Sequence, residues 1–338
     1  MSQRKTLGVI GAGAWGTALA QMLASDGREV ILWAYEPEVV AAINADHRNP
    51  LYLPSATLAP TIRATGELAD LATIDTVLVV TPAQVLGKVL GGLAHPPRDL
   101  VLCSKGIEAG SGRLMNDVAR EASPGSAIAV LSGPTFAHEV AAGLPTAVTL
   151  ACEGGGEQWA RLAPAIARPA FRPYYSDDVT GAEIGGAVKN VLAIACGVVE
   201  GLALGQNARA ALIARGFSEM TRFGEALGAQ TETLAGLCGL GDLVLTCSST
   251  SSRNFSLGKA LGEGASAADL MADRHTVAEG AHTAPVLAEL AGQRGIAMPI
   301  VAAVNAILGG ANARAVVAEL LARPLTAELD SDAKDIEA

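Results

Sequence analysis

Short runs of apolar, often β-branched residues alternate with helix-like stretches along the first half of the chain. Six of these runs predict buried strands, because they are short and are flanked by Gly, Pro or Asp. They are TLGVI (6–10), REVILW (28–33), TVLVV (76–80), LVLC (100–103), AIAVL (127–131) and TAVTL (146–150). The alternation predicts a mostly parallel sheet with helices on both faces. Ligands of such a sheet bind beyond the carboxyl ends of its strands.

From about residue 179 the pattern changes to long segments with helical spacing. These segments are 180–202, 208–227, 253–264, 283–295 and 299–310. The short run DLVLTC (242–247) fits neither helix nor strand clearly. We therefore expect an α/β protein with three parts: a doubly wound sheet domain over 1–178, a mainly α-helical domain over 179–323, and a flexible, charged tail over 324–338.

Composition narrows the classes of partner. Half of the 338 residues are hydrophobic and the formal net charge is −10, which argues against a nucleic-acid or anionic-membrane partner. An anionic substrate remains compatible, because a local cluster of Lys and Arg can dominate one cleft. The five cysteines form no CxxC pair, so we expect buried free thiols in a reducing cytoplasm. The cysteines and histidines show no metal-ligand spacing, and no metal is expected.

Two apolar stretches need a second interpretation. The uncharged stretch 6–25 follows two basic residues, as in a secretory signal, but three glycines interrupt it and a strand–turn–helix explains the same residues better. The apolar run 184–199 is a poor candidate for a membrane span, because Glu183, Lys189 and Glu200 place charges in it or beside it. We expect no membrane span.

A glycine-rich turn follows the first predicted strand. Gly11, Gly13 and Gly16 form a GxGxxG pattern that permits a tight turn, close approach of a pyrophosphate and close helix–strand packing. A turn without a ligand is the alternative, but the βαβ context favours a dinucleotide. Tyr35 and Glu36 follow the second strand without a basic neighbour. A carboxylate there suits a free ribose, so NAD is slightly favoured over NADP.

Lys189 lies about two turns into a predicted apolar helix. We interpret Thr180 and Glu183 as a capping box at its start. Long helical side chains lean toward the residues three and four positions back, which here are Gly186 and Gly185. The two glycines would leave a notch beside the ammonium, large enough for a small molecule. The alternative is that the notch admits another helix and that the lysine extends to water.

Several polar residues are candidate partners for this lysine. Asp242 lies between glycine turns in an apolar setting and offers a counter-charge, unless it only caps a helix. Lys105 follows a strand end, although a surface lysine would also fit there. Arg253 and Asn254 end a serine-rich loop before a helix predicted over 255–261. This combination suits a phosphate, and a solvated linker is the alternative.

Taken together, these segments resemble the bacterial NAD(P)-dependent glycerol-3-phosphate dehydrogenases. The resemblance runs in order from Leu7 to about Leu321. It is carried by GAGAWGTALA, SKGIE, LSGPTFAHEVAAGLPTA, GGAVKNVLAIACG, NARAALIARGFSEM, GLGDLVLTC, SSRN and EG at 279–280. It implies an N-terminal Rossmann domain, a helical C-terminal domain and the reversible reduction of dihydroxyacetone phosphate to sn-glycerol 3-phosphate for phospholipid synthesis. It also implies a homodimer.

The resemblance assigns roles to residues of this chain. Lys189 would be the proton donor and acceptor. The substrate would be bound by Lys105, Gly133, Thr135, Lys189, Asp242, Ser252, Arg253 and Asn254. The cofactor, NAD(H) or NADP(H), would be bound by Gly11, Gly13, Ala14, Trp15, Gly16, Tyr35, Lys105, Ala137, Arg253, Val277 and Glu279. Many relatives carry a basic residue near position 35, where this chain has Tyr35, and this again favours NAD.

The mechanism that follows is a hypothesis about Lys189. As hydride reaches C2 of the ketone, Lys189 would protonate the forming alkoxide. Burial and the Lys105 charge would lower its pKa, and Asp242 would oppose that shift. Arg253 would hold the phosphate and so place C2 correctly. His138 is an alternative acid that ranks lower, because it lies about a turn into its helix.

Two other functions remain open on the sequence alone. A related β-hydroxyacid dehydrogenase would keep Lys189 and Asn190 but would need a pocket for a carboxylate instead of a phosphate. A non-enzymatic NADH sensor would bind the cofactor without turnover and would not need a lysine in a notch.

Overall fold

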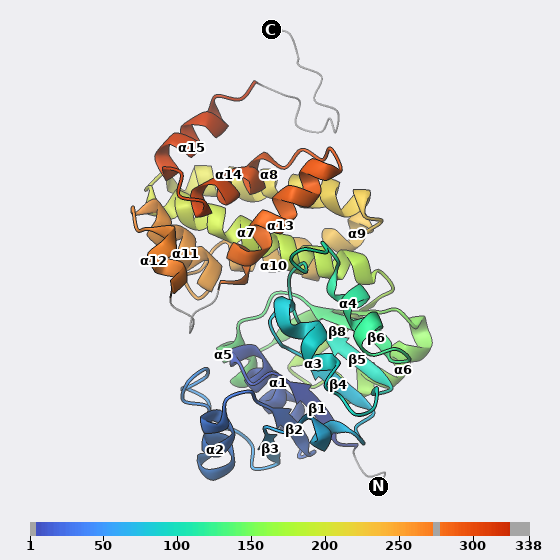
Figure 1. Cartoon of the computed structure of the whole chain (residues 1–338). Helices are drawn as coiled ribbons and strands as arrows, with labels where there is room; N and C mark the ends of the chain where they lie inside the picture. The colour runs from blue at the N-terminus through green and yellow to red at the C-terminus, as the bar shows by residue number, and fades with distance from the viewer. Residues whose placement is uncertain (1–4, 273–277, 325–338) are drawn as a thin grey trace.

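A single eight-stranded sheet forms the lower half of the molecule (Figure 1). The computed structural model describes residues 5–272 and 278–324. The strand order is β3-β2-β1-β4-β5-β6-β7-β8, and every neighbouring pair is parallel except β6 and β7. The strands are β1 Leu7–Ile10, β2 Val30–Trp33, β3 Ile62–Thr65, β4 Thr76–Val79, β5 Asp99–Leu102, β6 Ala127–Ser132, β7 Thr146–Cys152 and β8 Phe171–Ser176.

All six predicted strands are present, and two further strands were missed. Both missed strands, β3 and β8, are the edges of the sheet. Edge strands are covered less completely than central ones, so they lack the continuous apolar run by which a buried strand is recognised. β8 has the sequence FRPYYS, and half-exposed Tyr174 and Tyr175 are in its second half.

Helices cover both faces of the sheet, as predicted. α1 (Ala14–Ala24) and α6 (Gly155–Ile166) pack on one face, while α3 (Leu86–Leu90) and α4 (Met115–Ala122) pack on the other. β4 supplies Leu78 to the first core and Val77 and Val79 to the second, because successive strand side chains point to opposite faces. The remaining elements of this half are α2 (Pro37–Asp46), α5 (Ala137–Ala141) and the 3₁₀ turns η1 (Leu68–Leu71) and η2 (Ala83–Val85).

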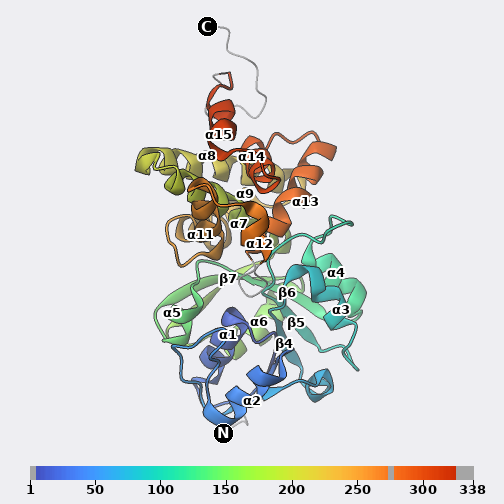
Figure 2. The same ribbon diagram turned by 60° about the vertical axis from the view of Figure 1, so that its left-hand side comes forward.

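The upper half of the molecule is helical, as expected (Figures 1 and 2). Its central element is α7 (Val179–Gly201), which is buried along nearly its whole length. The segment 242–247, which fitted neither pattern, belongs mostly to the helix α10 (Asp242–Thr246). The other elements are α8 Gly205–Ala226, α9 Thr231–Leu234, the π-helical turn η3 Leu237–Gly241, α11 Arg253–Gly262, α12 Ala267–Ala272, α13 Glu279–Gln293, α14 Pro299–Leu308 and α15 Ala313–Leu321.

Paired glycines bring α7 and α11 into backbone contact. Gly197 and Gly201 of α7 face Gly258 and Gly262 of α11. A Cβ atom at any of the four would lie closer to a carbonyl oxygen of the facing helix than atoms can approach. Glycine is required at these positions because the two backbones touch. This contact fixes the start of α11, and therefore the Arg253 loop, against α7.

The start of α7 differs from the predicted capping box. The N-cap lies two residues earlier, at Asp178, whose Oδ1 accepts a hydrogen bond from the Gly181 N–H at 2.7 Å. Thr180 is already inside the helix. Glu183 turns away to accept the Asn116 N–H at 2.8 Å, in the first turn of α4. The capping-box interpretation was wrong because a tertiary partner takes the Glu183 carboxylate.

α7 is long and apolar enough to cross a membrane by length and composition, but its apolar window is entirely buried by the rest of the protein. This burial is what a central core helix requires.

The sheet ends at Ser176, and α7 begins at Val179. The division of the chain at residue 178 stays a prediction, and the predicted tail, apart from Pro324, lies outside the described residues.

Candidate active site

The turn between β1 and α1 has the geometry of a dinucleotide site. Gly11 has φ +109°, and a Cβ there would lie 2.9 Å from the Val80 carbonyl oxygen. A Cβ at Gly16 would overlap the Gly11 carbonyl oxygen, whereas the space around Gly13 is open. Gly13 is also the N-cap of α1, with no side chain capping the helix. Free N–H groups at an open helix N-terminus fit a pyrophosphate.

Other predicted cofactor residues surround this turn. Ala14 and Trp15 are the first two residues of α1, and Ala137 is the first residue of α5. α5 packs beside α1, and Trp15 and Ala137 lie partly buried against the same core. Val277 lies outside the described residues.

The end of β2 bears on the choice of cofactor. Tyr35 is 80 % exposed. Glu36 is the N-cap residue of α2, and its Oε1 accepts a hydrogen bond from the Tyr52 hydroxyl at 2.8 Å. Burial and Glu36 together raise the pKa of Tyr52 to about 12. The hydroxyl therefore stays protonated and holds the carboxylate in place.

A buried carboxylate shared by two lysines forms the centre of the site. Asp242 is fully buried at the start of α10. Its Oδ1 lies 2.5 Å from Lys189 Nζ, and its Oδ2 lies 2.8 Å from Lys105 Nζ. The Lys189 side chain is 6 % exposed and that of Lys105 is 16 % exposed. The sequence predicted Asp242 as a counter-charge; the structure brings all three residues together.

The two lysines respond oppositely to this arrangement. Burial lowers the pKa of Lys189 to about 7; Asp242 opposes this shift and the neighbouring Lys105 charge adds to it. Burial also disfavours charge on Lys105, but the attraction of Asp242 outweighs it and raises that pKa. The two ammonium groups together outweigh burial at Asp242 and lower its pKa. Lys189 is therefore the group of the three that titrates near neutral pH, as a general acid should.

Thr246 completes this centre and was missed in the sequence. Its Oγ1 accepts a hydrogen bond from Lys189 Nζ at 3.1 Å and donates one to Asp242 Oδ1 at 3.2 Å. Residues four apart share a helix face, so Asp242 and Thr246 would have paired had 242–247 been recognised as helical.

The two glycines before Lys189 do different things. A Cβ at Gly185 would lie 2.5 Å from the Cys238 carbonyl oxygen, so this glycine admits the backbone of η3. A Cβ at Gly186 would lie 3.3 Å from both Lys105 Cγ and Ser132 Oγ. The predicted notch is therefore half filled by a packed helix, which was the alternative interpretation. Its Gly186 side receives the Lys105 stem.

The loop before α11 brings its polar residues to α7 and α13. Ser252 is the N-cap of α11, and its Oγ accepts the Phe255 N–H at 3.2 Å. Arg253 is exposed at the first helical position. Asn254 donates from Nδ2 to Asn190 Oδ1 at 3.1 Å and accepts the Gly280 N–H at 2.9 Å. Asn254 therefore ties three helices together.

Glu279 joins the same group of charges at the start of α13. Burial raises its pKa, and the positive charges of Arg253, Lys105 and Lys189 oppose that shift. Lys105, Lys189, Arg253 and Glu279 thus lie within one electrostatic cluster.

The loop after β6 reaches this cluster from the sheet. Gly133 packs on β7, where a Cβ would lie 2.9 Å from Val148 Cα. The Thr135 hydroxyl donates to the Gly133 carbonyl oxygen at 3.3 Å. Pro134 lies beside Gly241, which immediately precedes Asp242. His138, the lower-ranked acid, is more than half exposed beside Glu139.

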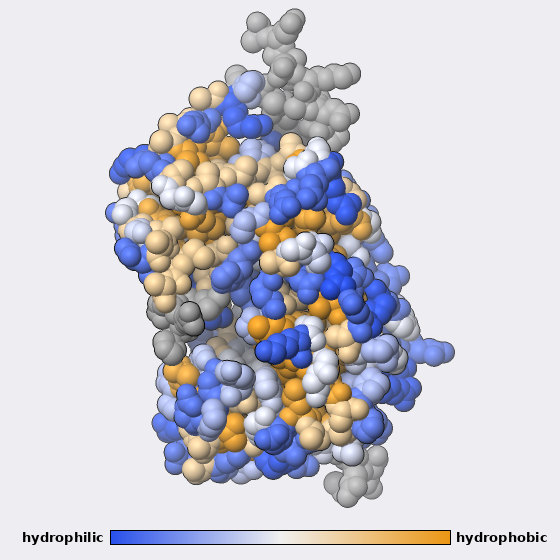
Figure 3. Space-filling view, viewed as in Figure 1, coloured by the Kyte–Doolittle hydropathy of each residue, from blue (hydrophilic) through white to orange (hydrophobic). Residues whose placement is uncertain are grey.

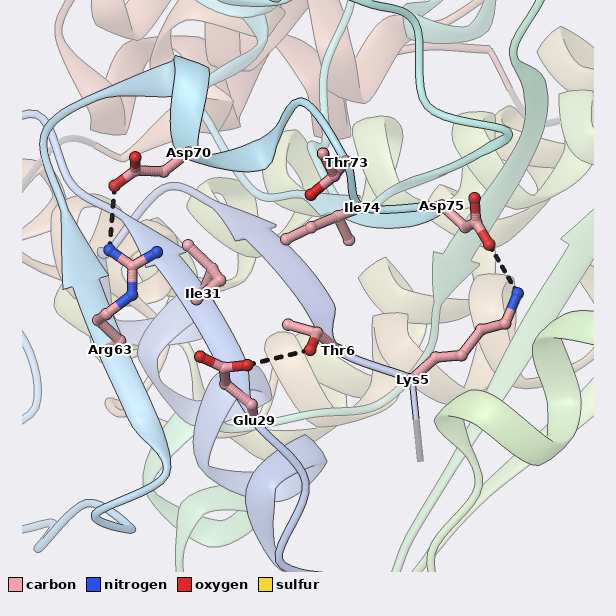
Figure 4. A pocket seen from close by; sticks show the side chains of 9 residues that line it. All are labelled: Lys5, Thr6, Glu29, Ile31, Arg63, Asp70, Thr73, Ile74 and Asp75. Atoms are coloured by element: carbon pink, nitrogen blue, oxygen red, sulfur yellow. Dashed lines mark hydrogen bonds and ion pairs between the residues drawn. The ribbon is translucent and has the colours of Figure 1, made fainter. Parts of the chain in front are cut away.

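Another hollow on the protein has a different character. A cavity of about 380 Å³ lies where β1, β2 and β4 begin, at the amino ends of the strands and so away from the glycine-rich turn (Figure 4). Four of its charged side chains pair with each other, Lys5 with Asp75 at 2.7 Å and Arg63 with Asp70 at 3.0 Å, and Glu29 accepts a hydrogen bond from the Thr6 hydroxyl at 3.1 Å. The described residues contain no group of three or more His, Cys, Asp or Glu that could hold a metal ion.

In Figure 3, hydrophilic residues border a hollow where the sheet half meets the helical half.

Two family profiles match the chain. "NAD-dependent glycerol-3-phosphate dehydrogenase N-terminus" matches residues 6–157, and the C-terminus profile of the same name matches residues 178–318. The chain belongs to this family. The predicted family membership, fold class and enzyme class, an NAD(P)-dependent glycerol-3-phosphate dehydrogenase, are confirmed.

Similar proteins agree over nearly the full length. A glycerol-3-phosphate dehydrogenase [NAD(P)+] of Erythrobacter litoralis is 77 % identical, covering 97 % of this chain and 99 % of its own. One of Novosphingobium aromaticivorans is 76 % identical, covering 95 % and 98 %. The crystal structure of glycerol-3-phosphate dehydrogenase from Coxiella burnetii superposes with a TM-score of 0.89 at 39 % identity, covering 95 % of this chain and 99 % of that one.

Proposed function

We propose that this chain catalyses the reversible reduction of dihydroxyacetone phosphate to sn-glycerol 3-phosphate, with Lys189 as the general acid. The observation that carries the mechanism is the buried Lys189–Asp242 pair, with its 2.5 Å separation and a Lys189 pKa of about 7. A lysine with this pKa donates a proton far more readily than a free lysine, whose pKa is about 10.4.

Proton transfer is the step that the residues of this chain perform. A bound nicotinamide cofactor supplies the hydride to C2 of the ketone. Lys189 gives its proton to the carbonyl oxygen as negative charge develops there, so that C2 of the product carries a neutral hydroxyl group. Asp242 and Thr246 hold Lys189 Nζ in place for this transfer. Lys189 is left neutral and takes a proton from water before the next turnover.

Placement of the substrate is assigned to the start of α11. The exposed Arg253 guanidinium and the α11 N-terminus form the phosphate site in this proposal, with Ser252 and Asn254 beside them. Holding the phosphate at a fixed distance from Lys189 turns binding energy into orientation of C2. Lys105, Gly133 and Thr135 approach from the sheet side.

The cofactor proposal is NAD(H) in preference to NADP(H). The β1–α1 turn fits the pyrophosphate. Glu36, fixed by Tyr52, offers an acceptor to the 2′-hydroxyl of a ribose and repels a 2′-phosphate. Exposed Tyr35 adds no positive charge.

Cellular context follows from the same family membership. The product is a building block of phospholipids. All five cysteines are free and buried, which suits a reducing cytoplasm. We also propose a homodimer, which sedimentation of the purified protein would test.

Two alternatives are distinguished from this proposal by specific residues. A β-hydroxyacid dehydrogenase would keep Lys189 and Asn190 but would bind a carboxylate in place of the phosphate. A sensor of NADH would not need Lys189 with a pKa near neutrality.

The direct test is oxidation of NADH and of NADPH by the purified protein with dihydroxyacetone phosphate. We expect turnover with both and a higher kcat/KM for NADH, because Glu36 repels a 2′-phosphate; a difference of about 1.4 kcal/mol would make the ratio about tenfold. Replacement of Glu36 by Gln should shrink that preference. Turnover with 3-hydroxyacids alone, or cofactor binding without turnover, would contradict the proposal.

A further inference from the structure

The side chain of Ser132 is a buried hydroxyl that no group of the described chain satisfies. Ser132 ends β6 and is 4 % exposed. Its Oγ has no hydrogen-bond partner among the residues that the structure describes. A buried hydroxyl without a partner costs about 1–3 kcal/mol, so such a position calls for a reason.

The surroundings of Ser132 place this hydroxyl in the Gly186 side of the notch. Ser132 Oγ and Lys105 Cγ each lie 3.3 Å from the point where a Cβ of Gly186 would be. Because long helical side chains lean over the residue three positions back, Gly186 lies beneath the Lys189 side chain. Gly133, a predicted substrate residue, follows Ser132 directly. The unsatisfied hydroxyl and the Lys105 stem thus border the same small space beside Gly186, one helical turn before Lys189.

A flexible side chain borders the same space. The Lys105 stem lies beside the Gly186 position that Ser132 Oγ also borders, and Lys105 Nζ reaches Asp242 Oδ2 at 2.8 Å. A phosphorylated substrate offers Lys105 a second anionic partner. Because this four-carbon stem is flexible, its movement toward that partner would widen the space at Ser132 Oγ without a change of the backbone.

We propose that Ser132 binds the terminal hydroxyl of the substrate, at the carbon that carries no phosphate, and so selects a hydroxymethyl ketone. This inference rests on the proposed function. The substrate has three polar parts, and two of them have charged partners: the phosphate at the α11 N-terminus and the carbonyl oxygen at Lys189. The neutral terminal hydroxyl needs a neutral partner that both donates and accepts, as a serine hydroxyl does.

The consequence for specificity is direct. A site that pairs a buried hydroxyl with the substrate rejects an analogue that lacks this group, because its own hydroxyl then stays unsatisfied. Acetol phosphate is such an analogue, with a methyl group in place of the hydroxymethyl group of dihydroxyacetone phosphate.

The test compares Ser132→Ala with wild type on these two ketones, with NADH in excess. We expect kcat/KM for dihydroxyacetone phosphate to fall about tenfold, as for loss of one hydrogen bond at the upper end of the usual range. The value for acetol phosphate should stay within about twofold, because that ketone never used the hydroxyl. The preference between the two ketones therefore falls about tenfold.

Two further variants keep the result interpretable. Ser123→Ala removes another buried hydroxyl, which pairs with Ser126 at 3.0 Å far from the notch, and should leave the preference unchanged. Ser132→Cys keeps nearly the same volume with a much weaker donor, so it should lose the preference even if Ser132→Ala folds poorly.

The outcomes separate the two proposals. An equal fall on both ketones, or no fall on either, overturns the role of Ser132 while the proposed function stands. A wild-type protein that reduces neither ketone overturns the proposed function and this inference with it.

Discussion

Replacement of Lys189 by methionine is expected to lower kcat for dihydroxyacetone phosphate reduction by about 10³-fold, in the range of a lost general acid. Methionine has an unbranched apolar side chain like the stem of lysine but has no group that can donate a proton. Because Arg253 and the α11 N-terminus remain in place, KM should change by much less than kcat. Steady-state kinetics with NADH measure both quantities.

The matched control is Lys88→Met. Lys88 is an exposed lysine of α3, so the same substitution there should leave kcat unchanged. A Lys189→Met protein with near wild-type kcat would remove Lys189 from the mechanism. A Lys189→Met protein that raises KM and leaves kcat intact would make Lys189 a binding residue only.

Replacement of Asp242 by asparagine is expected to be severe for stability and activity together. The substitution leaves the Lys105 and Lys189 ammonium groups facing each other without a counter-charge. Breaking a buried pair in this way costs about 3–5 kcal/mol of unfolding free energy. The pKa of Lys189 would fall further, since Asp242 is the attraction that now holds it up. Urea unfolding and kcat measure the two effects.

A second substitution shows whether charge is the cause. Lys105→Met added to Asp242→Asn removes one of the two unpaired ammonium groups, so the double variant should be more stable than Asp242→Asn alone. Asp75→Asn breaks an exposed pair with Lys5 and should cost less than about 1 kcal/mol. An Asp242→Asn protein as stable and active as wild type would contradict the account of this centre.

The sequence predicts the central architecture well, because a buried strand or helix needs a local pattern of apolar residues. The six apolar runs became strands, and the long helical segments became helices, since each had to bury an apolar surface of its own. β3 and β8 were not predicted, because edge strands do not need such apolar runs. The four-residue spacing of Gly197 and Gly201, and of Gly258 and Gly262, is present in the sequence. Which helix each pair contacts depends on the tertiary fold.

The site was predictable in its members and not in its geometry. Lys189, Lys105 and Asp242 each stood out as charges in apolar or strand-end positions. That one carboxylate serves both lysines depends on α10 being a helix, and 242–247 was too short to show it. Thr246 was missed for the same reason. The capping box predicted for Glu183 was wrong, because the sequence does not distinguish a capping glutamate from one that accepts the N–H of Asn116.

The central claim is that Lys189 delivers the proton, and the pH dependence of ketone reduction tests it most directly. The titratable groups whose charges interact with Lys189 include Asp242, Lys105, Glu279 and Cys247. Asp242 and Lys105 keep their charges around pH 7 because their pKa values move away from neutrality. With a Lys189 pKa of about 7, kcat/KM should be level at lower pH and fall about tenfold per pH unit above 7, while the reverse oxidation should rise through the same pH. A reduction rate that is level from about pH 6 to 9 in the wild type, or that falls identically in Lys189→Met, would contradict the account.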